Sequence, residues 1–400
     1  MLSVAEAQAK VLQLARPQKP QSLPLTPAAH GLVLAEDIVS DLDMPPYDKA
    51  LMDGYAVRAT DVADGQGLLT VIEEVTAGQV PKLPVGPGQA TRIMTGAPIP
   101  AGADAVVMIE RTKQPDPSHI HVDDKPIRPG MNLLARAREM RRGETVLAAG
   151  AVLRPQEFGL LASVGRTEVK LYPRPQVAVL STGDEIVEAS ETPGPGQIRN
   201  GNGPMLLAQV LRAGGLPKFL GIARDRVDSL RPLLVEGLKN QILVLSGGVS
   251  AGKLDLVPGV LQELGVEAHF HKVEMKPGKP VFFGSRAGTL VFGLPGNPVS
   301  ALVCFELFVR PAIQRLLGRA EPGPAMLPAK LIDDFTYKTD RPTYYPAVLR
   351  LGSAGWEVQP VPWFGSADLR GLTHAEAFVL FPAGDHQHRA GQVFSVLGVE

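Results

Sequence analysis

Apolar residues at helical spacing mark two predicted helices in the first part of the chain. Residues 4–14 carry apolar side chains every three or four positions, which places them on one face of a helix. Ser3 and Glu6 form the Ser-x-x-Glu pattern of a capping box, and Pro17 follows the last periodic residue. Residues 155–164 show a similar spacing and predict a second helix.

Between these two helices the apolar positions form short runs typical of β-strands. Gly and Pro residues separate the runs, and the predicted strands cover residues 69–75, 105–110 and 120–122. This alternation predicts a small β-rich subdomain.

From residue 177 onward, apolar runs of strand length alternate with stretches of helix length. The predicted strands are 177–180, 219–222, 242–245, 281–283 and 289–292. The predicted helices are 204–213, 230–238, 256–264 and 299–317, with Pro311 inside the last. Such alternation is typical of a multidomain α/β protein with a doubly wound, mostly parallel sheet. After a linker at 318–324, residues 330–400 return to short strands and predict a small C-terminal β-barrel.

Composition and charge narrow the class of protein. The chain has 400 residues, enough for about two to four domains. Lys and Arg (40) balance Asp and Glu (41), which argues against a nucleic-acid-binding role. The single cysteine excludes a disulfide framework and a multi-cysteine metal site. The sequence contains no apolar run of about 18 residues, and Glu6 and Lys10 interrupt the region where a signal peptide would be apolar. We therefore expect a cytoplasmic protein with no membrane segment.

Three predicted strands of the α/β domain end in loops of small residues. These loops are residues 181–185 (STGDE), 246–250 (SGGVS) and 293–298 (GLPGNP). Ligands of open α/β sheets bind beyond the carboxyl ends of the strands, where glycines let backbone N–H groups approach an anion. One such loop is better explained by a tight turn, but three on one sheet favour a binding site. The loops match neither a Walker A motif nor a dinucleotide fingerprint, so nucleotide hydrolysis of the usual kind and NAD binding are disfavoured.

Charged residues accompany these loops. Lys276 and Lys279 stand on one stiff Lys-Pro-Gly-Lys turn that suits a phosphate or another oxyanion, or that simply faces solvent. Acidic residues follow the predicted strands at Asp184, Glu185, Asp225 and Asp255. Carboxylates beside a phosphate repel it unless a hard cation lies between them, so Mg²⁺ is the natural inference. The alternative is that Asp184, Asp225 and Asp255 only cap helices.

Eight motifs, in this order along the chain, resemble the molybdopterin molybdenumtransferase family, which includes MoeA of bacteria and the matching domain of gephyrin. They are residues 52–56 (MDGYA), 94–100 (MTGAPIP), 102–107 (GADAVV), 181–185, 246–250, 276–280 (KPGKP), 293–301 (GLPGNPVSA) and 365–366 (GS). The resemblance covers essentially the whole chain.

The resemblance implies a homodimer of four-part protomers. It divides the chain into an N-terminal region (1–170) with an inserted β-rich subdomain (about 46–142), an α/β molybdopterin-binding domain (171–320) and a β-barrel (325–400). It also implies the reaction of adenylated molybdopterin with molybdate to give molybdenum cofactor and AMP, with Mg²⁺ as cofactor. The active site would lie in a cleft between subunits. A molybdopterin adenylyltransferase and proteins that mature molybdoenzymes would be further partners.

The family's site residues carry over by motif. The resemblance implies catalytic roles for Glu185, Asp255 and the partner subunit's Asp53, which would help to hydrolyse the adenylate or place the metal. It implies metal binding by Glu185, Asp225 and Asp255. The implied substrate-binding residues are Thr95, Thr182, Gly183, Asp184, Gly247, Gly248, Ser250, Lys276, Lys279, Pro295, Gly296, Asn297, Pro298 and Ser366.

Some positions depart from the family pattern. Lys253 stands where the family usually has an acid, residues 137–139 read Ala-Arg-Glu in place of Gly-Glu-Asp, and Arg226 follows Asp225 where a second acid is usual. Each change makes the expected cleft less negative. Two alternatives therefore stay open: a pterin-binding or scaffold paralogue with weak or no turnover, and a variant that inserts tungsten.

Overall fold

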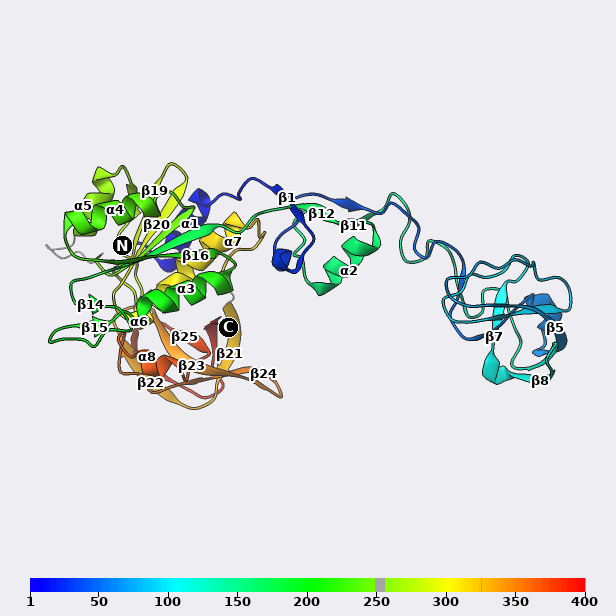
Figure 1. The fold of residues 1–400 in the computed structure, drawn as a ribbon. Coiled ribbons are helices and arrows are strands. Elements are labelled where there is room, and N and C mark those ends of the chain that lie inside the picture. The colour runs from blue at the N-terminus through cyan, green and yellow to red at the C-terminus, as the bar shows by residue number, and fades with distance from the viewer. Residues whose placement is uncertain (249–255, 325, 400) are drawn as a thin grey trace. The chain divides into compact units, whose positions relative to one another are not determined.

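The computed structural model describes residues 1–248, 256–324 and 326–399, which form two compact units (Figure 1). One unit, here called the α/β–barrel unit, comprises residues 1–35, 152–154 and 168–400. The other, here called the β-rich unit, comprises residues 36–151 and 155–167. The chain thus passes from the first unit into the second and back.

A six-stranded mixed sheet forms the centre of the α/β–barrel unit. Its spatial order is β16-β13-β17-β20-β19-β18. Strands β16, β13, β17 and β20 are mutually parallel, whereas β19 runs antiparallel to both of its neighbours, β20 and β18, so the predicted mostly parallel sheet is confirmed. The strands are β13 (Gln176–Thr182), β16 (Leu216–Ala223), β17 (Ile242–Ser246), β18 (Glu267–Phe270), β19 (Phe282–Arg286) and β20 (Thr289–Leu294). Strand β18 was not predicted, because it is a short edge strand with one buried residue.

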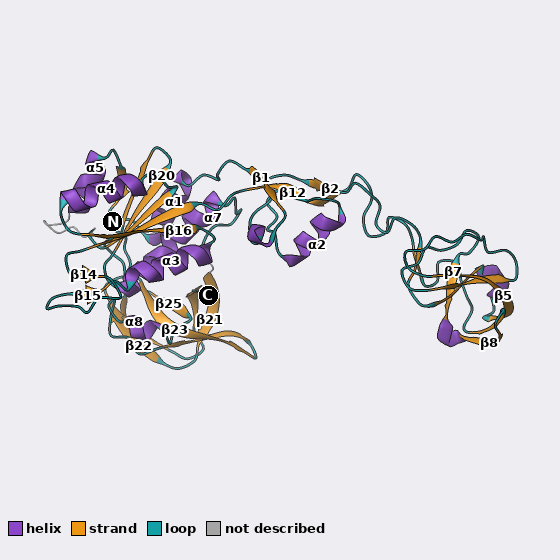
Figure 2. Ribbon diagram, in the orientation of Figure 1, coloured by secondary structure: helices purple, strands orange, loops and turns teal. Residues whose placement is uncertain are grey.

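Helices cover both faces of this sheet (Figure 2). Helix α3 contacts α6 and α7, whereas α4 contacts α5. The helices are α1 (Val4–Leu14), α3 (Asn202–Ala213), α4 (Val227–Gly237), α5 (Leu256–Glu263), α6 (Pro298–Cys304) and α7 (Arg310–Leu316). The predicted capping box of Ser3 and Glu6 is present on α1. Helix α4 begins at Val227, earlier than predicted, and the Ser229 hydroxyl in its first turn accepts a hydrogen bond from the Arg224 N–H (2.9 Å).

The predicted helix 299–317 is continuous but contains a π-helical segment, Phe305–Val309, between α6 and α7. Pro311 has no N–H to offer to the carbonyl four residues earlier. That carbonyl, of Leu307, accepts a hydrogen bond from the Gln8 side chain of α1 (3.0 Å). The irregularity therefore also fastens the N-terminal helix to the domain.

The C-terminal part of the same unit is a closed five-stranded barrel, as predicted. Its strands follow the order β21-β24-β23-β25-β27. They are β21 (Met326–Leu331), β23 (Thr343–Gly352), β24 (Gly355–Pro360), β25 (Ala377–Phe381) and β27 (Val393–Gly398). Several smaller elements complete the unit. They are a ribbon of β22 (Phe335–Thr339) and β26 (Gly384–His388), the short helix α8 (Leu369–Leu372), the pair β1 (Gln21–Pro24) with β12 (Glu168–Leu171), and the pair β14 (Ile186–Val187) with β15 (Ile198–Arg199).

The β-rich unit is built on a second six-stranded sheet, with the order β7-β4-β6-β5-β9-β8. Apolar clusters around Val107 and Ile93 pack on its strands. The strands are β4 (Gly54–Val57), β5 (Gln66–Val75), β6 (Gln89–Ile93), β7 (Ala105–Met108), β8 (Thr112–Asp116) and β9 (His119–Asp123). The β-rich unit also contains helix α2 (Pro155–Ser163) and two strand pairs. These pairs are β2 (Ile38–Val39) with β11 (Thr145–Leu147), and β3 (Lys49–Ala50) with β10 (Leu133–Leu134). The predicted strand 105–110 ends at Met108, where a 3₁₀ turn begins.

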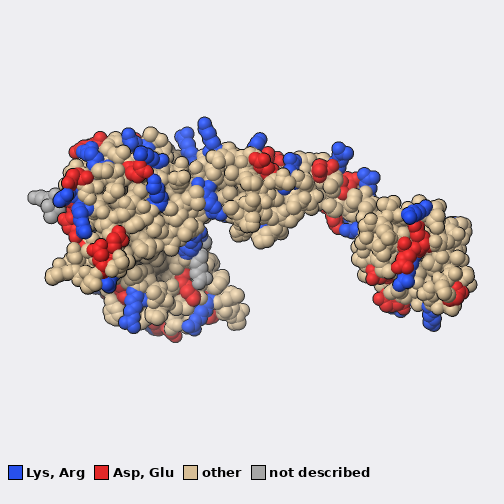
Figure 3. All heavy atoms as spheres, in the orientation of Figure 1, with Lys and Arg blue, Asp and Glu red and all other residues tan. Residues whose placement is uncertain are grey.

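On the surface that Figure 3 shows, charge is spread rather than gathered by sign. On the face drawn in Figure 3, acidic and basic side chains are interspersed. This distribution agrees with the near-zero net charge of the sequence. Within the described residues, none of the helices has the length and apolar character needed to cross a membrane.

Candidate functional site

The three small-residue loops lie together because their strands are neighbours in the sheet. Ser181 of β13 pairs with Ser246 of β17, which in turn pairs with Leu294 of β20, so the three strands end at one level. The segments that follow them line a pocket of about 720 Å³, here called the loop pocket.

Most of the predicted site residues that the structure describes in this region line the loop pocket. They are Thr182, Gly183, Glu185, Asp225, Gly247, Gly248, Pro295, Gly296, Asn297 and Pro298. Asp184 is not among the lining residues described; its carboxylate accepts a hydrogen bond from the Asp225 N–H (3.1 Å) and so ties the loops after β13 and β16 together. Ser250, Lys253 and Asp255 lie outside the described residues.

Glycines in these loops are required by close packing. Gly247 and Gly248 have positive φ angles of 90° and 64°. A Cβ on Gly247 would lie 2.6 Å from the Thr182 carbonyl oxygen, and one on Gly248 would lie 2.7 Å from the Thr182 hydroxyl. Gly183 has a positive φ of 144°, a backbone conformation that residues with a Cβ rarely adopt. Small residues therefore bring two loops into direct contact and leave backbone at the pocket wall.

Replacing Gly248 with alanine is expected to lower the free energy of unfolding by about 2 kcal/mol, because a left-handed backbone strains any residue with a Cβ and Thr182 leaves no room for it. Gly259 is a matched control: it lies in α5, and a Cβ added there would have no other atom within 4 Å. Gly259→Ala should raise the stability by about 0.5–1 kcal/mol through helix propensity. Urea unfolding of the three proteins measures both effects, and equal stabilities would contradict the packing argument.

Two asparagines that we did not predict as site residues organise the loop pocket. The Asn202 side-chain amide donates to the Ser246 hydroxyl (2.8 Å) and to the Gly296 carbonyl (2.7 Å), which links the loops after β17 and β20. The Asn200 amide oxygen accepts from the Ser181 hydroxyl (3.1 Å) and from the Gly203 N–H (2.9 Å). In the sequence, both stand just before the predicted helix 204–213.

The acidic residues of the loop pocket suit Mg²⁺ better than a metal that needs a closed protein cage. Glu185 and Asp225 both line the pocket. Among the described residues, no group of three or more His, Cys, Asp or Glu is placed to hold a metal. Mg²⁺ is usually bound by one or two carboxylates, with water and substrate phosphates completing its octahedron. Two carboxylates on the lining of one pocket therefore fit this ion.

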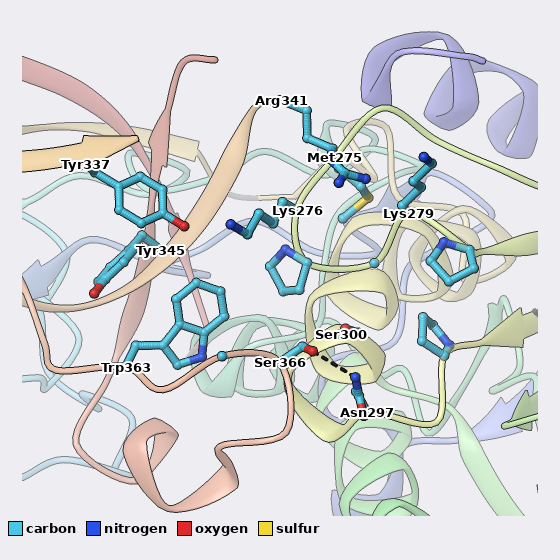
Figure 4. A pocket seen from close by; sticks show the side chains of 15 residues that line it. Met275, Lys276, Lys279, Asn297, Ser300, Tyr337, Arg341, Tyr345, Trp363 and Ser366 are labelled. Atoms are coloured by element: carbon cyan, nitrogen blue, oxygen red, sulfur yellow. Dashed lines mark hydrogen bonds between the residues drawn. The ribbon is translucent and has the colours of Figure 1, made fainter. Parts of the chain in front are cut away.

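A second pocket of about 450 Å³, here called the lysine pocket, adjoins the loop pocket. Pro280, Pro295 and Asn297 line both. The Asn297 amide donates to the Ser366 hydroxyl (2.8 Å), which joins the loop after β20 to the barrel (Figure 4). The predicted residues Lys276, Lys279 and Ser366 line the lysine pocket. Thus two lysines, a serine and the third loop lie around one cavity.

The turn that carries both lysines is fixed by the barrel and by a buried cysteine. The Lys276 N–H donates to the Pro342 carbonyl (2.9 Å), and the Tyr344 N–H donates to the Lys276 carbonyl (2.7 Å). Cys304 packs against Gly278, and burial raises the pKa of its thiol, so the sulfur stays protonated and serves as a small apolar residue. Lys276 is thereby held between the sheet and the barrel.

The lysine pocket has a third cation that sequence reasoning missed. Arg341 lines it from the segment between β22 and β23, and its guanidinium also binds the Asp340 carboxylate (2.9 and 3.1 Å). The sequence offered only an isolated basic residue in the barrel, with no motif around it. Because Asp340 offsets the charge of Arg341, the two lysines supply most of the net positive charge at this cavity, which favours an anion.

Asp53 and Thr95 form a separate concave site in the β-rich unit. One Asp53 carboxylate oxygen accepts hydrogen bonds from the Thr95 N–H and hydroxyl, each 2.7 Å long. These bonds, the backbone bond first, lower the pKa of Asp53, so the carboxylate is ionised at neutral pH. Both residues line a pocket of about 520 Å³ together with Met52, Met108, Glu110 and Arg111.

Two of the positions that depart from the family pattern, Glu139 and Arg226, take part in ion pairs. Glu139 forms an ion pair with Lys49 (3.3 Å), and Arg226 forms one with Asp228 (2.8 Å). Ala137 adopts a left-handed conformation (φ 59°) at the position where the family pattern has glycine. The changes at 138 and 226 therefore leave the lining of the loop pocket and the lysine pocket unaltered, because neither arginine lines them.

Comparisons with known families cover nearly the whole chain. Residues 2–165 match the MoeA N-terminal region (domains I and II). Residues 178–315 match a probable molybdopterin-binding domain, and residues 328–399 match the MoeA C-terminal region (domain IV).

Individual relatives agree with these matches. A molybdopterin molybdenumtransferase of Staphylococcus aureus is 36% identical over 92% of this chain and 88% of its own length. The Bacillus subtilis protein of the same name is 34% identical over 99% of this chain and 94% of its own. A crystal structure of a molybdopterin biosynthesis MoeA protein from Pyrococcus horikoshii superposes with a TM-score of 0.83 at 30% identity, covering 100% of both chains. The chain belongs to the molybdopterin molybdenumtransferase (MoeA) family.

Proposed function

We propose that this chain inserts molybdenum into adenylated molybdopterin and releases molybdenum cofactor and AMP. The observation that carries the proposal is the junction of two pockets of different chemistry, which share Pro280, Pro295 and Asn297. The substrate carries a phosphoanhydride close to the dithiolene that receives the metal. An enzyme for this reaction therefore needs a phosphate site beside a site for the molybdate oxyanion. The names of the relatives support the same transfer reaction.

The lysine pocket is the proposed molybdate site. Molybdate is a tetrahedral dianion, and Lys276, Lys279 and Arg341 supply positive charge around one cavity. The Ser366 hydroxyl and the Asn297 amide add neutral hydrogen-bonding groups at its edge. The sulfur ligands that finally hold the metal belong to the pterin, so the protein needs no thiolate of its own.

The loop pocket is the proposed site of the phosphoanhydride. Its glycine-rich wall can offer backbone N–H groups to phosphate oxygens. Release of AMP breaks the anhydride: a water oxygen adds to one phosphorus, the bridging oxygen leaves on the other phosphate, and a carboxylate accepts the proton of the water. Glu185 and the partner subunit's Asp53 are the proposed acceptors, and Asp255 stays a prediction from the motif.

The proposed Mg²⁺ ligands are Glu185 and Asp225, because both carboxylates line the loop pocket. The ion would offset negative charge that develops on phosphoryl oxygens. Further proposals from the family are a homodimer, with Asp53 acting on the loop pocket of the other subunit, and supply of the substrate by an adenylyl-transferring enzyme.

The test is direct: the purified chain, given adenylated molybdopterin, molybdate and Mg²⁺, should release AMP as the adenylate is consumed. Adding EDTA should stop the release, and excess Mg²⁺ should restore it. A lack of AMP release across a wide range of Mg²⁺ concentrations would contradict the proposal. Binding of the pterin without turnover would favour the scaffold alternative, and faster turnover with tungstate than with molybdate would favour the tungsten alternative.

A further inference from the structure

One wall of the lysine pocket is aromatic, which the binding of molybdate does not require. Tyr337 of β22, Tyr345 of β23 and Trp363 of the segment after β24 line it. Figure 4 shows these three side chains on one side of the cavity, with Lys276 between them and Lys279. A tetrahedral oxyanion gains nothing from flat π surfaces, so this wall calls for a second ligand group.

Packing within the barrel holds the aromatic wall rigid. The rings of Tyr345 and Trp363 meet edge to face, with centroids 5.2 Å apart and an angle of 84°. Tyr337 and Tyr345 meet in the same way at 5.1 Å. Trp363 and Tyr337 also pack on the apolar core of the barrel. A ligand that stacks on this wall would meet a surface that needs little further ordering.

The cations of the pocket lie beside this wall. The Lys276 ammonium lies 5.4 Å from the centroid of the Tyr337 ring. The wall therefore places flat apolar area next to the cations of the same pocket.

We propose that the aromatic wall, with Trp363 as its main contact, binds the fused heterocycle of the pterin; this inference rests on the proposed function. In adenylated molybdopterin the dithiolene lies between the pterin rings and the phosphates. If the metal oxyanion sits between the lysines, the ring system next to it is the pterin, and the adenine lies beyond the anhydride. The heterocycle offers a flat face for stacking on this wall.

A tryptophan-fluorescence titration tests this assignment. The chain has two tryptophans, so Trp356→Phe leaves Trp363 as the only reporter. Pterin-6-carboxylate should change the Trp363 emission in a saturable way, and AMP should not. A response to AMP with none to the pterin, or no response to either, would overturn the proposal.

Variants separate a stacking role from a structural one. Trp363→Ala should weaken pterin-6-carboxylate binding about 10-fold or more, as for other base–aromatic stacks, while Trp363→Phe should keep most of the affinity. Molybdate affinity should stay unchanged in both. Phe364→Ala is the matched control, since Phe364 is the next residue, is 92% exposed and is not one of the residues lining the pocket. Equal pterin affinity in all variants would overturn the proposal even if the wild-type chain releases AMP, so its failure is distinguishable from failure of the proposed function.

Discussion

Asp53→Ala is expected to reduce the rate of AMP release by about 100-fold or more, the usual contribution of a positioned general base. The fold should survive, because Asp53 is exposed and its carboxylate bonds only to Thr95 among the hydrogen bonds described. Single-turnover AMP release and thermal unfolding of the same preparations measure the two properties. Asp64→Ala, an exposed acid of the same unit, is the control for activity and should leave the rate of AMP release unchanged.

The rate of AMP release should also depend on pH through the ionisation of Asp53. The Thr95 hydrogen bonds lower the pKa of Asp53, so the carboxylate stays ionised to lower pH than an ordinary aspartate. Thr95→Val removes the hydroxyl bond but not the backbone bond. The pKa of Asp53 should therefore rise, and the acidic limb of the pH–rate profile should move to higher pH with a smaller loss of rate than in Asp53→Ala. Wild-type rates in Asp53→Ala would remove this residue from the mechanism.

Mixing two inactive chains would show whether Asp53 acts across subunits. Asp53→Ala chains and Lys276→Ala/Lys279→Ala chains each lack one half of the proposed site. If a dimer combines halves from two chains, random mixing should restore about a quarter of the wild-type activity, since half of the dimers would have one complete site. No recovery in exchanged dimers would place both halves in one chain.

Lys279→Ala is expected to weaken molybdate binding by about 10- to 100-fold, the range for losing one charge-assisted contact. Lys279 lines the lysine pocket at its exposed side, whereas Lys276 is partly buried there. Lys279→Arg should keep part of the affinity because it keeps the charge. Isothermal titration calorimetry with molybdate measures each value.

Salt provides the second part of the lysine test. Screening weakens the attraction between exposed charges, so the difference between wild type and Lys279→Ala should shrink as NaCl increases. Lys272→Ala, an exposed lysine four residues from Lys276 that does not line the pocket, is the matched control. An unchanged molybdate affinity in Lys279→Ala at low salt would count against the role of this lysine.

The regular elements of the sheet were predictable because their signals are local. Strands β13, β17 and β20 are continuous apolar runs, as expected for parallel strands buried on both faces. Each run stops at a Ser, Gly or Pro cluster, and those clusters form the wall of the loop pocket. Errors occurred at boundaries, as at Ser229 and Met108, where a side-chain bond or a 3₁₀ turn overrides the pattern.

Site residues that belong to no sequence motif could not be predicted in the same way. Arg341 and Trp363 carry no motif, and they reach the lysine pocket only because the barrel packs on the turn at Lys276. Asn202 likewise acquires its role from two loops that are distant in sequence. Asp184 differs from these residues because it lies inside a motif but is not among the residues lining the loop pocket. Its carboxylate bonds instead to the loop after β16.

The sequence by itself determined the family, the alternating elements of the α/β domain, the barrel and the loops that carry small residues, since each depends on a pattern within a few neighbouring positions. Only the tertiary structure decided that the lysine turn, Arg341 and an aromatic wall share one cavity beside the loop pocket. The physical reason is that a pocket is a property of packing: its walls come from segments whose distance along the chain carries no information about their distance in space.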